Sequence, residues 1–289
     1  MNPNYLKNIP QWYKDTKDYE LILTDDIDSL LSCAILEHVK GWHIEQTMLF
    51  KASGSKDTIL YDYLGVTENS TQKDEIGVDL ALTRGKCFDN HVTRLNYQDK
   101  GNLESINPNI MDHVNRNNYW KKYAMSTVLL LWSIYDLPKE NLSDELMMML
   151  LTIDASYVGY YDEYFRQYTK HYLVDVLDLP EFYRCLSRHK KHEFMDIQKK
   201  YKLKEKIGAK KGYLETDIKI DAINKLLARN TKIKITLPTA HFSAHKTFID
   251  VGMGITHCQP NSIEEIESDI FCYALTTKHF LNYSQEVNA

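Results

Sequence analysis

The hydrophobic residues in the first hundred positions come in short runs, most of which end in a carboxylate or a histidine. The apolar run at residues 20–24 stops at three aspartates, and the runs at residues 75–83 and 86–92 carry Asp79 and Asp89. Residues 42–50 form another such run. Apolar runs of this length, flanked by polar residues, are typical of buried strands. The pattern therefore predicts four strands.

Helical spacing appears between these runs. Leu30, Leu31, Ala34 and Ile35 recur near a helical period within residues 29–41, and Gly41 suits a helix C-cap. We also interpret residues 57–65 as a short helix. Strands that alternate with helices predict an α/β fold with an open, mainly parallel sheet flanked by helices, and ligands of such sheets gather at the carboxyl ends of the strands.

The pattern becomes mostly helical from residue 117 to about 178. Residues 119–138 read as one long apolar helix stopped by Pro138, and Ser143 can cap the next one. The basic segment that follows has a stripe of Phe194, Ile197 and Tyr201, which indicates an amphipathic helix. Residues 219–230 predict a helix, whereas 232–238, 247–255 and 270–284 have strand-like alternation. We therefore divide the chain into residues 1–184, a linker helix at 185–213, and a smaller α+β substrate-binding domain at 214–289.

Composition narrows the class of protein. The chain is 43% hydrophobic and 26% charged, which is typical of globular proteins. We find no apolar run of membrane-spanning length and no signal-peptide pattern at the N-terminus, and we expect no membrane partner. The five cysteines have no CxxC spacing. They predict reduced thiols in a cytoplasmic protein and argue against a disulfide framework or a zinc site.

Charge is distributed unevenly along the chain. Residues 184–213 contain eleven Lys or Arg and three Asp or Glu, a net charge of +8, whereas the rest of the chain carries −13. A basic strip on an acidic body favours a polyanionic partner. A solvated helix in a lysine-rich chain explains the same pattern, and both interpretations stay open here.

Four groups of carboxylate and histidine residues suggest chemistry: Asp26 with Asp28, Asp79, the run Asp89-Asn90-His91, and Asp154. Each group alone has an ordinary explanation, such as a helix N-cap, a strand-edge residue or a satisfied polar side chain. One helix start uses one capping carboxylate, so capping does not explain the whole set. Oxygen ligands with an imidazole suit Mn²⁺ or Mg²⁺. We expect two ions bridged by a central aspartate, or one ion.

The ordered set resembles the DHH phosphoesterase superfamily, which includes RecJ-type single-strand exonucleases, nanoRNA and cyclic-dinucleotide phosphodiesterases, and manganese-dependent family II pyrophosphatases. The run DIDSLLSCAIL is similar to the first motif and its helix. The run SINPN, residues 105–109, lies where an Asn-Pro often follows the DHH motif, and AMSTVLLLW resembles the helix before the fourth motif. The resemblance covers roughly residues 19–160, and it makes residues 1–184 a metal-binding catalytic domain.

The resemblance also assigns roles to residues. It implies a metal-ligand set of Asp26, Asp28, Asp79, Asp89, Asn90 and Asp154. Asp79 would bridge the metals and take part in catalysis, and His91 would contact the scissile phosphate. Asn90 replaces the first histidine of the motif and can ligate through its carbonyl oxygen.

The chain departs from the family at three further places. Thr24 or Ile22 stands where relatives have another Asp or His. Only ten residues separate Asp79 from Asp89, which suggests a direct strand-to-strand turn in place of the usual helix. The glycine-rich element of the family's second domain has no clear counterpart, and residues 251–257 are only weakly similar to it.

These inferences predict a manganese-dependent phosphodiesterase, a nuclease-like hydrolase that acts on short or single-stranded nucleic acid. The substrate-binding residues would be His91, Lys190, Lys191, Lys199, His241 and His245. Two alternatives stay open: a hydrolase of small phosphoanhydrides or cyclic dinucleotides, and a catalytically impaired DHH-fold protein that binds nucleic acid or a protein. The chain is compatible with a homodimer under each of these hypotheses.

Overall fold

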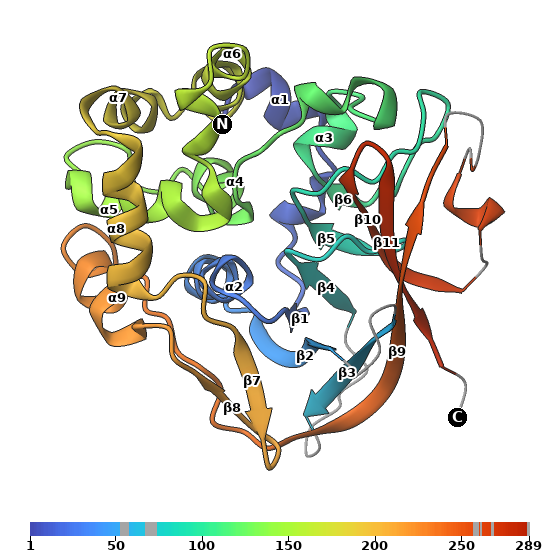
Figure 1. Cartoon of the computed structure of the whole chain (residues 1–289). Helices are drawn as coiled ribbons and strands as arrows, with labels where there is room; N and C mark the ends of the chain where they lie inside the picture. Colours follow the sequence, from blue (N-terminus) through green and yellow to red (C-terminus); the bar gives the residue numbers. More distant parts are fainter. Residues whose placement is uncertain (53–57, 67–73, 257–259, 261, 267–268, 288–289) are drawn as a thin grey trace.

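A computed structural model describes residues 1–52, 58–66, 74–256, 260, 262–266 and 269–287 (Figure 1). Its main sheet has nine strands in the order β10-β11-β9-β3-β2-β1-β4-β5-β6. Five neighbouring strands run parallel: β2 (His43–Ala52), β1 (Glu20–Leu23), β4 (Glu75–Val78), β5 (Lys86–Phe88) and β6 (Ser105–Ile106). The other four are antiparallel: β3 (Thr58–Val66), β9 (Phe242–Gly254), β10 (Ile270–Thr277) and β11 (Phe280–Glu286). The predicted α/β class with a parallel sheet flanked by helices is confirmed.

The central strand β1 is buried on both faces, which explains its uninterrupted apolar sequence. Leu21 and Leu23 belong to the large core under the helices, whereas Ile22 packs on the opposite face with Met48 and Phe248. Strand β1 leads directly into helix α2 (Ile27–Lys40), which ends at Gly41 in the left-handed conformation, φ 71°. The predicted strand and helix at this junction are both confirmed.

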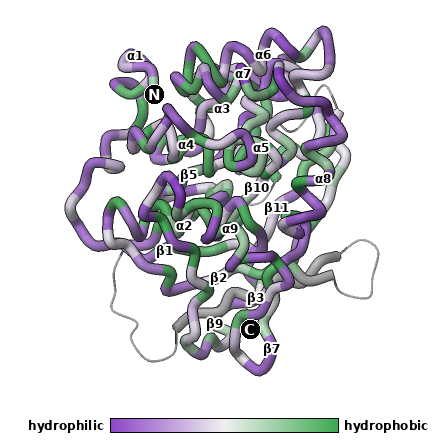
Figure 2. The backbone as a smooth tube through the Cα atoms, turned by 90° about the vertical axis from the view of Figure 1, so that its left-hand side faces the viewer, coloured by the Kyte–Doolittle hydropathy of each residue, from purple (hydrophilic) through white to green (hydrophobic). Residues whose placement is uncertain are grey.

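Helices cover the parallel part of the sheet: in Figure 1 most of them lie to the left of the parallel strands, and α1 and α3 lie above these strands. Their bounds are α1 (Pro3–Asn8), α3 (Pro108–Met111), α4 (Thr127–Ile134), α5 (Asp144–Thr152), α6 (Arg166–Lys170), α7 (Pro180–Arg188), α8 (Lys191–Tyr201) and α9 (Ile220–Leu227). Hydrophobic colour dominates α2 at the centre of the molecule, whereas the outer helix α6 is mostly hydrophilic (Figure 2). The long helix predicted at residues 119–138 is shorter, because Ser126 caps α4 and residues 116–121 form 3-10 turns.

Two predicted elements are wrong. Residues 57–65 were expected to be helical, but residues 58–65 of this range belong to β3, which pairs with β2 on one side and β9 on the other. Aromatic and β-branched residues favour such a strand once partners exist on both sides. Residues 232–238 were expected to be a strand but form none. Ile233 and Ile235 are buried there. The side-chain amide of Asn224 donates to the backbone oxygen of Ile235 and accepts from its backbone N–H.

The connection between β4 and β5 is not the expected direct turn, because the two strands run parallel. Parallel neighbours normally need a helical crossover. Here an irregular, non-helical segment makes the crossover and hydrogen-bonds to β10: Thr83 N donates to Phe271 O at 2.8 Å, and Tyr273 N donates to Ala81 O at 3.0 Å. Strand β10 thus stabilises the short connection, and Leu80 and Leu82 pack on the sheet where a helix would otherwise lie.

The basic segment is not one helix. It contains the end of α7, helix α8 and strand β7 (Ile207–Lys210), which pairs with β8 (Tyr213–Thr216). Lys202 ends α8 in the left-handed conformation. The predicted apolar stripe of α8 holds, since Phe194 and Tyr201 are buried and Ile197 is partly buried against the core. Strand β9 pairs with β3, so the C-terminal strands extend the sheet of the N-terminal segment. The domain boundaries themselves stay a prediction.

Two further sequence expectations concern thiols and membrane spans. Cys33, Cys87, Cys185 and Cys272 are buried and unpaired, whereas Cys258 lies outside the described residues. Within the part of the chain that is described, no helix has both the length and the apolar character needed to cross a membrane.

Gly77 should be intolerant of a side chain because β4 is closely packed. A Cβ atom at this position would lie 3.0 Å from Leu82 Cδ1 and 3.2 Å from Cys87 Cβ. We expect Gly77→Val to lower the free energy of unfolding by about 1–3 kcal/mol, measured by urea denaturation. The matched control is Gly208→Val in β7, where a Cβ meets nothing within 4 Å. Equal losses in both variants would contradict this account.

Candidate metal centre

Three aspartates from distant parts of the chain meet beyond the carboxyl ends of β1 and β4. Asp28 lies in the first turn of α2, Asp79 directly follows β4, and Asp154 lies in the 3-10 turn that follows α5. One carboxylate oxygen from each lies within 4.8 Å of the others. The structure therefore brings together three of the aspartates that the sequence singled out, at the sheet edge where ligands of α/β proteins bind.

Asp28 is the most deeply buried of the three, with 1% of its surface exposed. Its carboxylate accepts the backbone N–H groups of Thr127, at 2.9 Å, and Val128, at 2.8 Å, in the first turn of α4. These donors and the helix dipole favour the charged form. Burial nevertheless raises the pKa of Asp28 well above its ordinary value, and the charges of Asp79 and Asp154 raise it further. A nearby cation would offset this repulsion.

Asp79 and Asp154 both have left-handed backbone conformations, with φ of 57° and 52°. Such conformations are uncommon outside glycine and often occur at functional sites. Thr127 Oγ1 donates to Asp79 Oδ1 at 2.9 Å, and Asn90 Nδ2 donates to Asp154 Oδ2 at 2.7 Å. Burial, then the charge of Asp154, raises the pKa of Asp79. Loss of water around its carboxylate, then the charge of Asp26, raises the pKa of Asp154, although that residue as a whole is exposed.

A second group shares Asp79 with the first. Ligand atoms of Asp79, Asp89 and His91 also lie within 4.8 Å of one another. His91 Nδ1 lies 2.7 Å from Asp89 Oδ1, and Asn107 Nδ2 donates to Asp89 Oδ2 at 2.7 Å. Burial alone would lower the pKa of His91, but the carboxylate of Asp89, then those of Asp79 and Asp154, raises it to about 10. The ring is therefore protonated at neutral pH.

Asp26 is a helix N-cap, the ordinary explanation that the sequence offered for it, and both Asp25 and Asp26 also pair with Lys206. Asp26 caps α2, because its Oδ1 accepts the N–H groups of Asp28 and Ser29, and its Oδ2 lies 3.3 Å from Lys206 Nζ. Asp25 is 5% exposed, and its Oδ1 accepts from Lys206 Nζ at 2.9 Å. Which of the three aspartates caps α2 depends on where the chain leaves β1. Composition alone does not predict that position.

The donor set fits a divalent cation that prefers oxygen ligands. Among the described residues, no lysine or arginine forms an ion pair with Asp28, Asp79 or Asp154. Asp28 and Asp79 are buried, and the three carboxylates repel one another even though the His91 ring lies close to Asp79. Carboxylate oxygens are ligands that suit Mn²⁺ or Mg²⁺. Asn90 donates its amide to two of these carboxylates, and rotation of that amide would turn Oδ1 toward them as a ligand.

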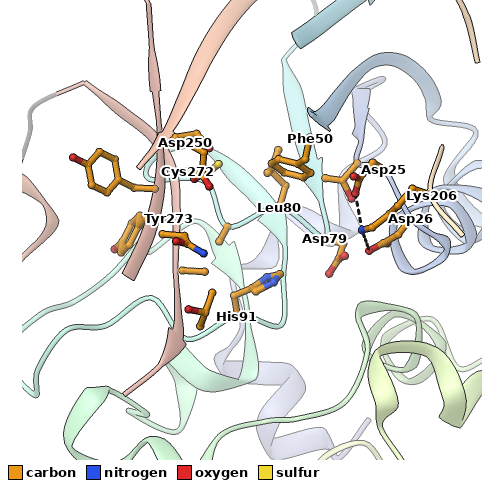
Figure 3. A pocket seen from close by; sticks show the side chains of 17 residues that line it. Asp25, Asp26, Phe50, Asp79, Leu80, His91, Lys206, Asp250, Cys272 and Tyr273 are labelled. Atoms are coloured by element: carbon orange, nitrogen blue, oxygen red, sulfur yellow. Dashed lines mark hydrogen bonds and ion pairs between the residues drawn. The ribbon is translucent and has the colours of Figure 1, made fainter. Parts of the chain in front are cut away.

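A cavity of about 250 Å³ opens above these groups (Figure 3). Asp26, Asp79, His91 and Lys206 line one side, and residues of β10 and β11, including Tyr273, line the other. A second hollow, bounded by Asp28, Asp154 and Lys204, lies beside it. Both hollows have charged side chains in their walls and are large enough for a phosphate group.

The remaining residues predicted to bind substrate do not line these two hollows. Lys190, Lys191 and Lys199 lie on or next to α8, outside both cavities, whereas Lys204 and Lys206 of the same basic segment line them. His241 packs edge-on against Tyr213, with ring centroids 5.3 Å apart. The side chain of His245 lies outside the described residues.

Several supporting residues were not predicted as site residues. Asn107 holds Asp89 and also donates to the backbone oxygen of His91 at 2.7 Å. Asn109 donates to the backbone oxygen of Asn90 at 2.7 Å. Both belong to the SINPN run, so the Asn-Pro pair was a usable signal. Thr127 and Lys206 had no local signal, because their roles depend on contacts across 48 or more residues.

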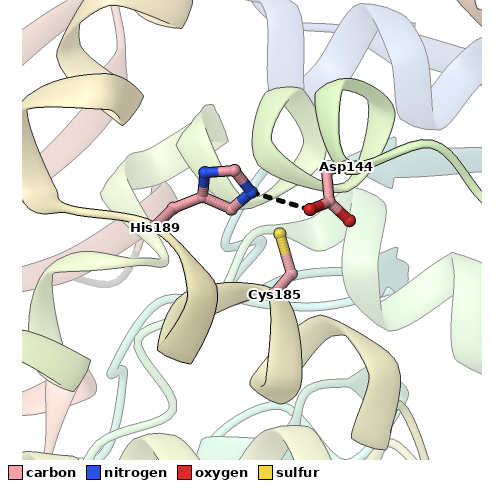
Figure 4. A group of neighbouring side chains, drawn as sticks. All are labelled: Asp144, Cys185 and His189. Carbon is pink, nitrogen blue, oxygen red and sulfur yellow. Dashed lines mark hydrogen bonds and ion pairs between the residues drawn. The ribbon is translucent and has the colours of Figure 1, made fainter.

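A third group, Asp144, Cys185 and His189, links α5 to α7 and to the start of α8 (Figure 4). His189 Nε2 lies 2.8 Å from Asp144 Oδ2, and Arg188 also binds this carboxylate. Burial, then the charge of Asp144, raises the pKa of Cys185 to about 12, so its thiol stays protonated. Because Asp144 already has two cationic partners, we assign this group to helix packing.

Comparisons with known proteins add no relative: no protein-family model, curated protein or solved structure matches the chain. The functional argument therefore rests on the geometry of the site.

The contribution of Asp144 to stability should depend on pH. The hydrogen bond from Arg188 lowers the pKa of Asp144, so the stabilisation is present above the ordinary carboxyl range and is lost as the pH falls through the lowered pKa. We expect Asp144→Asn to cost about 0.5 kcal/mol at pH 7, because the pair is half exposed, and the difference from the unchanged protein to close in acid. Urea denaturation at several pH values measures this. Asp196→Asn, an exposed change on α8, is the control, and a gap that widens in acid would contradict the assignment.

Proposed function

We propose that the protein is a metal-dependent phosphoesterase that uses Mn²⁺ or Mg²⁺ to hydrolyse phosphodiester bonds in short or single-stranded nucleic acid. The observation that carries the proposal is the pair of ligand groups that share Asp79, a residue that lines the 250 Å³ cavity together with His91. A shared carboxylate between two oxygen-rich positions is the arrangement that two-metal hydrolases use. We propose two ions, with Asp79 between them.

The order of the site residues supports a distant relationship to the DHH superfamily. Of the six ligands that the resemblance implies, Asp28, Asp79, Asp89, Asn90 and Asp154 would hold the cations, whereas Asp26 caps α2 and pairs with Lys206. The contacts of Asn107 with Asp89, and of the α4 N-terminus with Asp28, involve two further runs that resemble the family. On this proposal the chain is a divergent member in which Asn90 replaces a histidine ligand.

The chain's own groups would orient the phosphate. Divalent cations, when bound, activate water and neutralise phosphate charge. His91, whose Nδ1 is held by Asp89, would donate from Nε2 to a phosphate oxygen in the cavity that it lines. Lys206, with its ammonium group between Asp25 and Asp26, would attract the polyanionic substrate to the same opening.

A second candidate function is binding without catalysis. Lys206 Nζ lies 3.3 Å from Asp26 Oδ2, so an internal ammonium group already pairs with a residue expected to be a metal ligand. Together with Asn90, this contact favours a weakened metal site and a protein that binds nucleic acid or a protein partner. The two experiments below separate the candidates.

Metal binding should depend on Asp79. We expect a hundredfold excess of Mn²⁺ over its Kd to raise the Tm of the protein by about 5 °C, because binding to the folded state alone contributes about 2.7 kcal/mol. Asp79→Asn should abolish this rise, since it removes the shared ligand while its amide oxygen can still accept from Thr127. Differential scanning fluorimetry with bound-metal analysis measures both effects. Asp196→Asn is the control, and Mn²⁺ stabilisation that persists in Asp79→Asn would exclude this centre.

Hydrolysis should follow the same residue. We expect Mn²⁺-stimulated cleavage of a labelled short oligonucleotide, with Asp79→Ala reduced to the level of the uncatalysed reaction and Asp196→Ala unchanged. Pyrophosphate and a cyclic dinucleotide tested in parallel identify the substrate class. Metal binding without turnover of any of these substrates would favour the binding protein, and full activity in Asp79→Ala would refute the catalytic proposal.

A further inference from the structure

A third cavity, of about 390 Å³, lies next to the candidate metal centre. Its wall is more apolar than the walls of the two hollows described above. Segments around η2 (Arg116–Lys121), η4 (Val158–Tyr161) and α6 form most of its wall, with Lys278 from the β10–β11 turn at its border. Its main aromatic residues are Tyr119, Trp120, Phe165, Tyr168 and Tyr172. The cavity is of the size and chemistry that small organic ligands occupy.

The lining includes large side chains that folding leaves in water. Trp120 is 41% exposed, Phe165 40% and Val158 38%. Single exposed apolar residues are common, but a cluster of them around one hollow marks a binding surface. Packing does not explain this cluster, because the other three tryptophans of the chain are 9% exposed or less.

Two lysines border the aromatic surface. Lys122 Nζ lies 4.8 Å from the centroid of the Tyr119 ring and 3.2 Å from its hydroxyl oxygen. Lys278 is exposed on the opposite turn. A ligand with an aromatic ring and an anionic group can contact both the aromatic residues and the lysines of this wall. An alkyl chain can contact only the aromatic residues.

The aromatic cavity and the metal centre share residues. Asp154 and Ala155 line this cavity and also the hollow over Asp28. A ring held between Trp120 and Phe165 would therefore be joined through only a short linker to a group at the carboxylates. Nucleotides have this composition, since a sugar connects a flat base to a phosphate.

We infer that this cavity binds a nucleobase of the substrate whose phosphate lies at the metal centre, and that stacking on Trp120 and Phe165 holds the base. The inference rests on the proposed function, because that function places the phosphate. Stacking on aromatic side chains accepts any base. The cavity thus selects nucleotides over base-free phosphoesters without selecting a sequence.

The probe is AMP, titrated into the protein while tryptophan fluorescence is recorded, because Trp120 is the exposed tryptophan of the chain. We expect quenching that saturates. Phe165→Ala should weaken AMP binding about tenfold or more, whereas Phe165→Leu, which keeps the bulk without the ring, should lose nearly as much. Tyr97→Ala, which removes an aromatic residue that is 73% exposed and outside the cavity, should leave the Kd unchanged. Lys122→Gln should weaken AMP more than adenosine.

The kinetic readout separates base binding from chemistry. Phe165→Ala should raise KM for a short oligonucleotide with little change in kcat, and it should leave turnover of an abasic oligonucleotide of the same length, which has the phosphodiester backbone but no bases, unchanged. An equal loss on both substrates, or an unchanged Kd for AMP in both Phe165 variants, would overturn the inference.

The two proposals fail in different ways. If Mn²⁺ does not bind but AMP binding still depends on Phe165, the proposed function fails and the nucleobase cavity stands. If Mn²⁺-dependent hydrolysis occurs and AMP binding ignores Phe165, the proposed function stands and the cavity is not a base site. Binding of an unrelated apolar peptide, with no response to AMP, would assign the surface to a protein partner and would also overturn the inference.

Discussion

The hydrogen bonds of the buried carboxylate of Asp28 hold three parts of the fold together. Asp28 belongs to α2, accepts two backbone N–H groups at the start of α4, and lies 3.4 Å from the amide of Asn90, just beyond β5. Each partner offsets part of the cost of burying a charge. The positions of α4 and of the residues after β5 therefore follow from one side chain, and the same contacts determine where Asp79 and Asp154 can meet it.

The site also concentrates backbone strain and like charge. Asp79 and Asp154 have positive φ angles, and the pKa values of Asp28, Asp79 and Asp154 are all raised, by burial and by neighbouring carboxylates. Neither feature stabilises the folded chain by itself, and such features persist at sites where a ligand uses them. A cation at the carboxylates would offset the repulsion directly, which a purely structural role for these residues does not do.

The sequence predicted the parts of the fold that depend on local pattern. The β1–α2 junction, Gly41 as its C-cap, and the buried stripe of α8 follow from periodicity and capping. Segments 57–65 and 232–238 were misread, because pairing with the distant strand β9 decided the first and hydrogen bonds with the Asn224 side chain decided the second. The same limit applies to the site. Local spacing identified the aspartates, but the role of Lys206 depends on a contact 180 residues away, with Asp26.

Asp154 joins the two chemical environments of the molecule. Its carboxylate lies with Asp28 and Asp79, while the residue also lines the aromatic cavity. Asp154 and Ala155 both have left-handed backbone conformations, which interrupt the helical path after α5. Because of this turn, Asp154 lines two neighbouring hollows. A helix continued through this position would place successive side chains on its own faces. The strained turn thus explains, by one local feature, why an apolar cavity and a carboxylate cluster lie side by side.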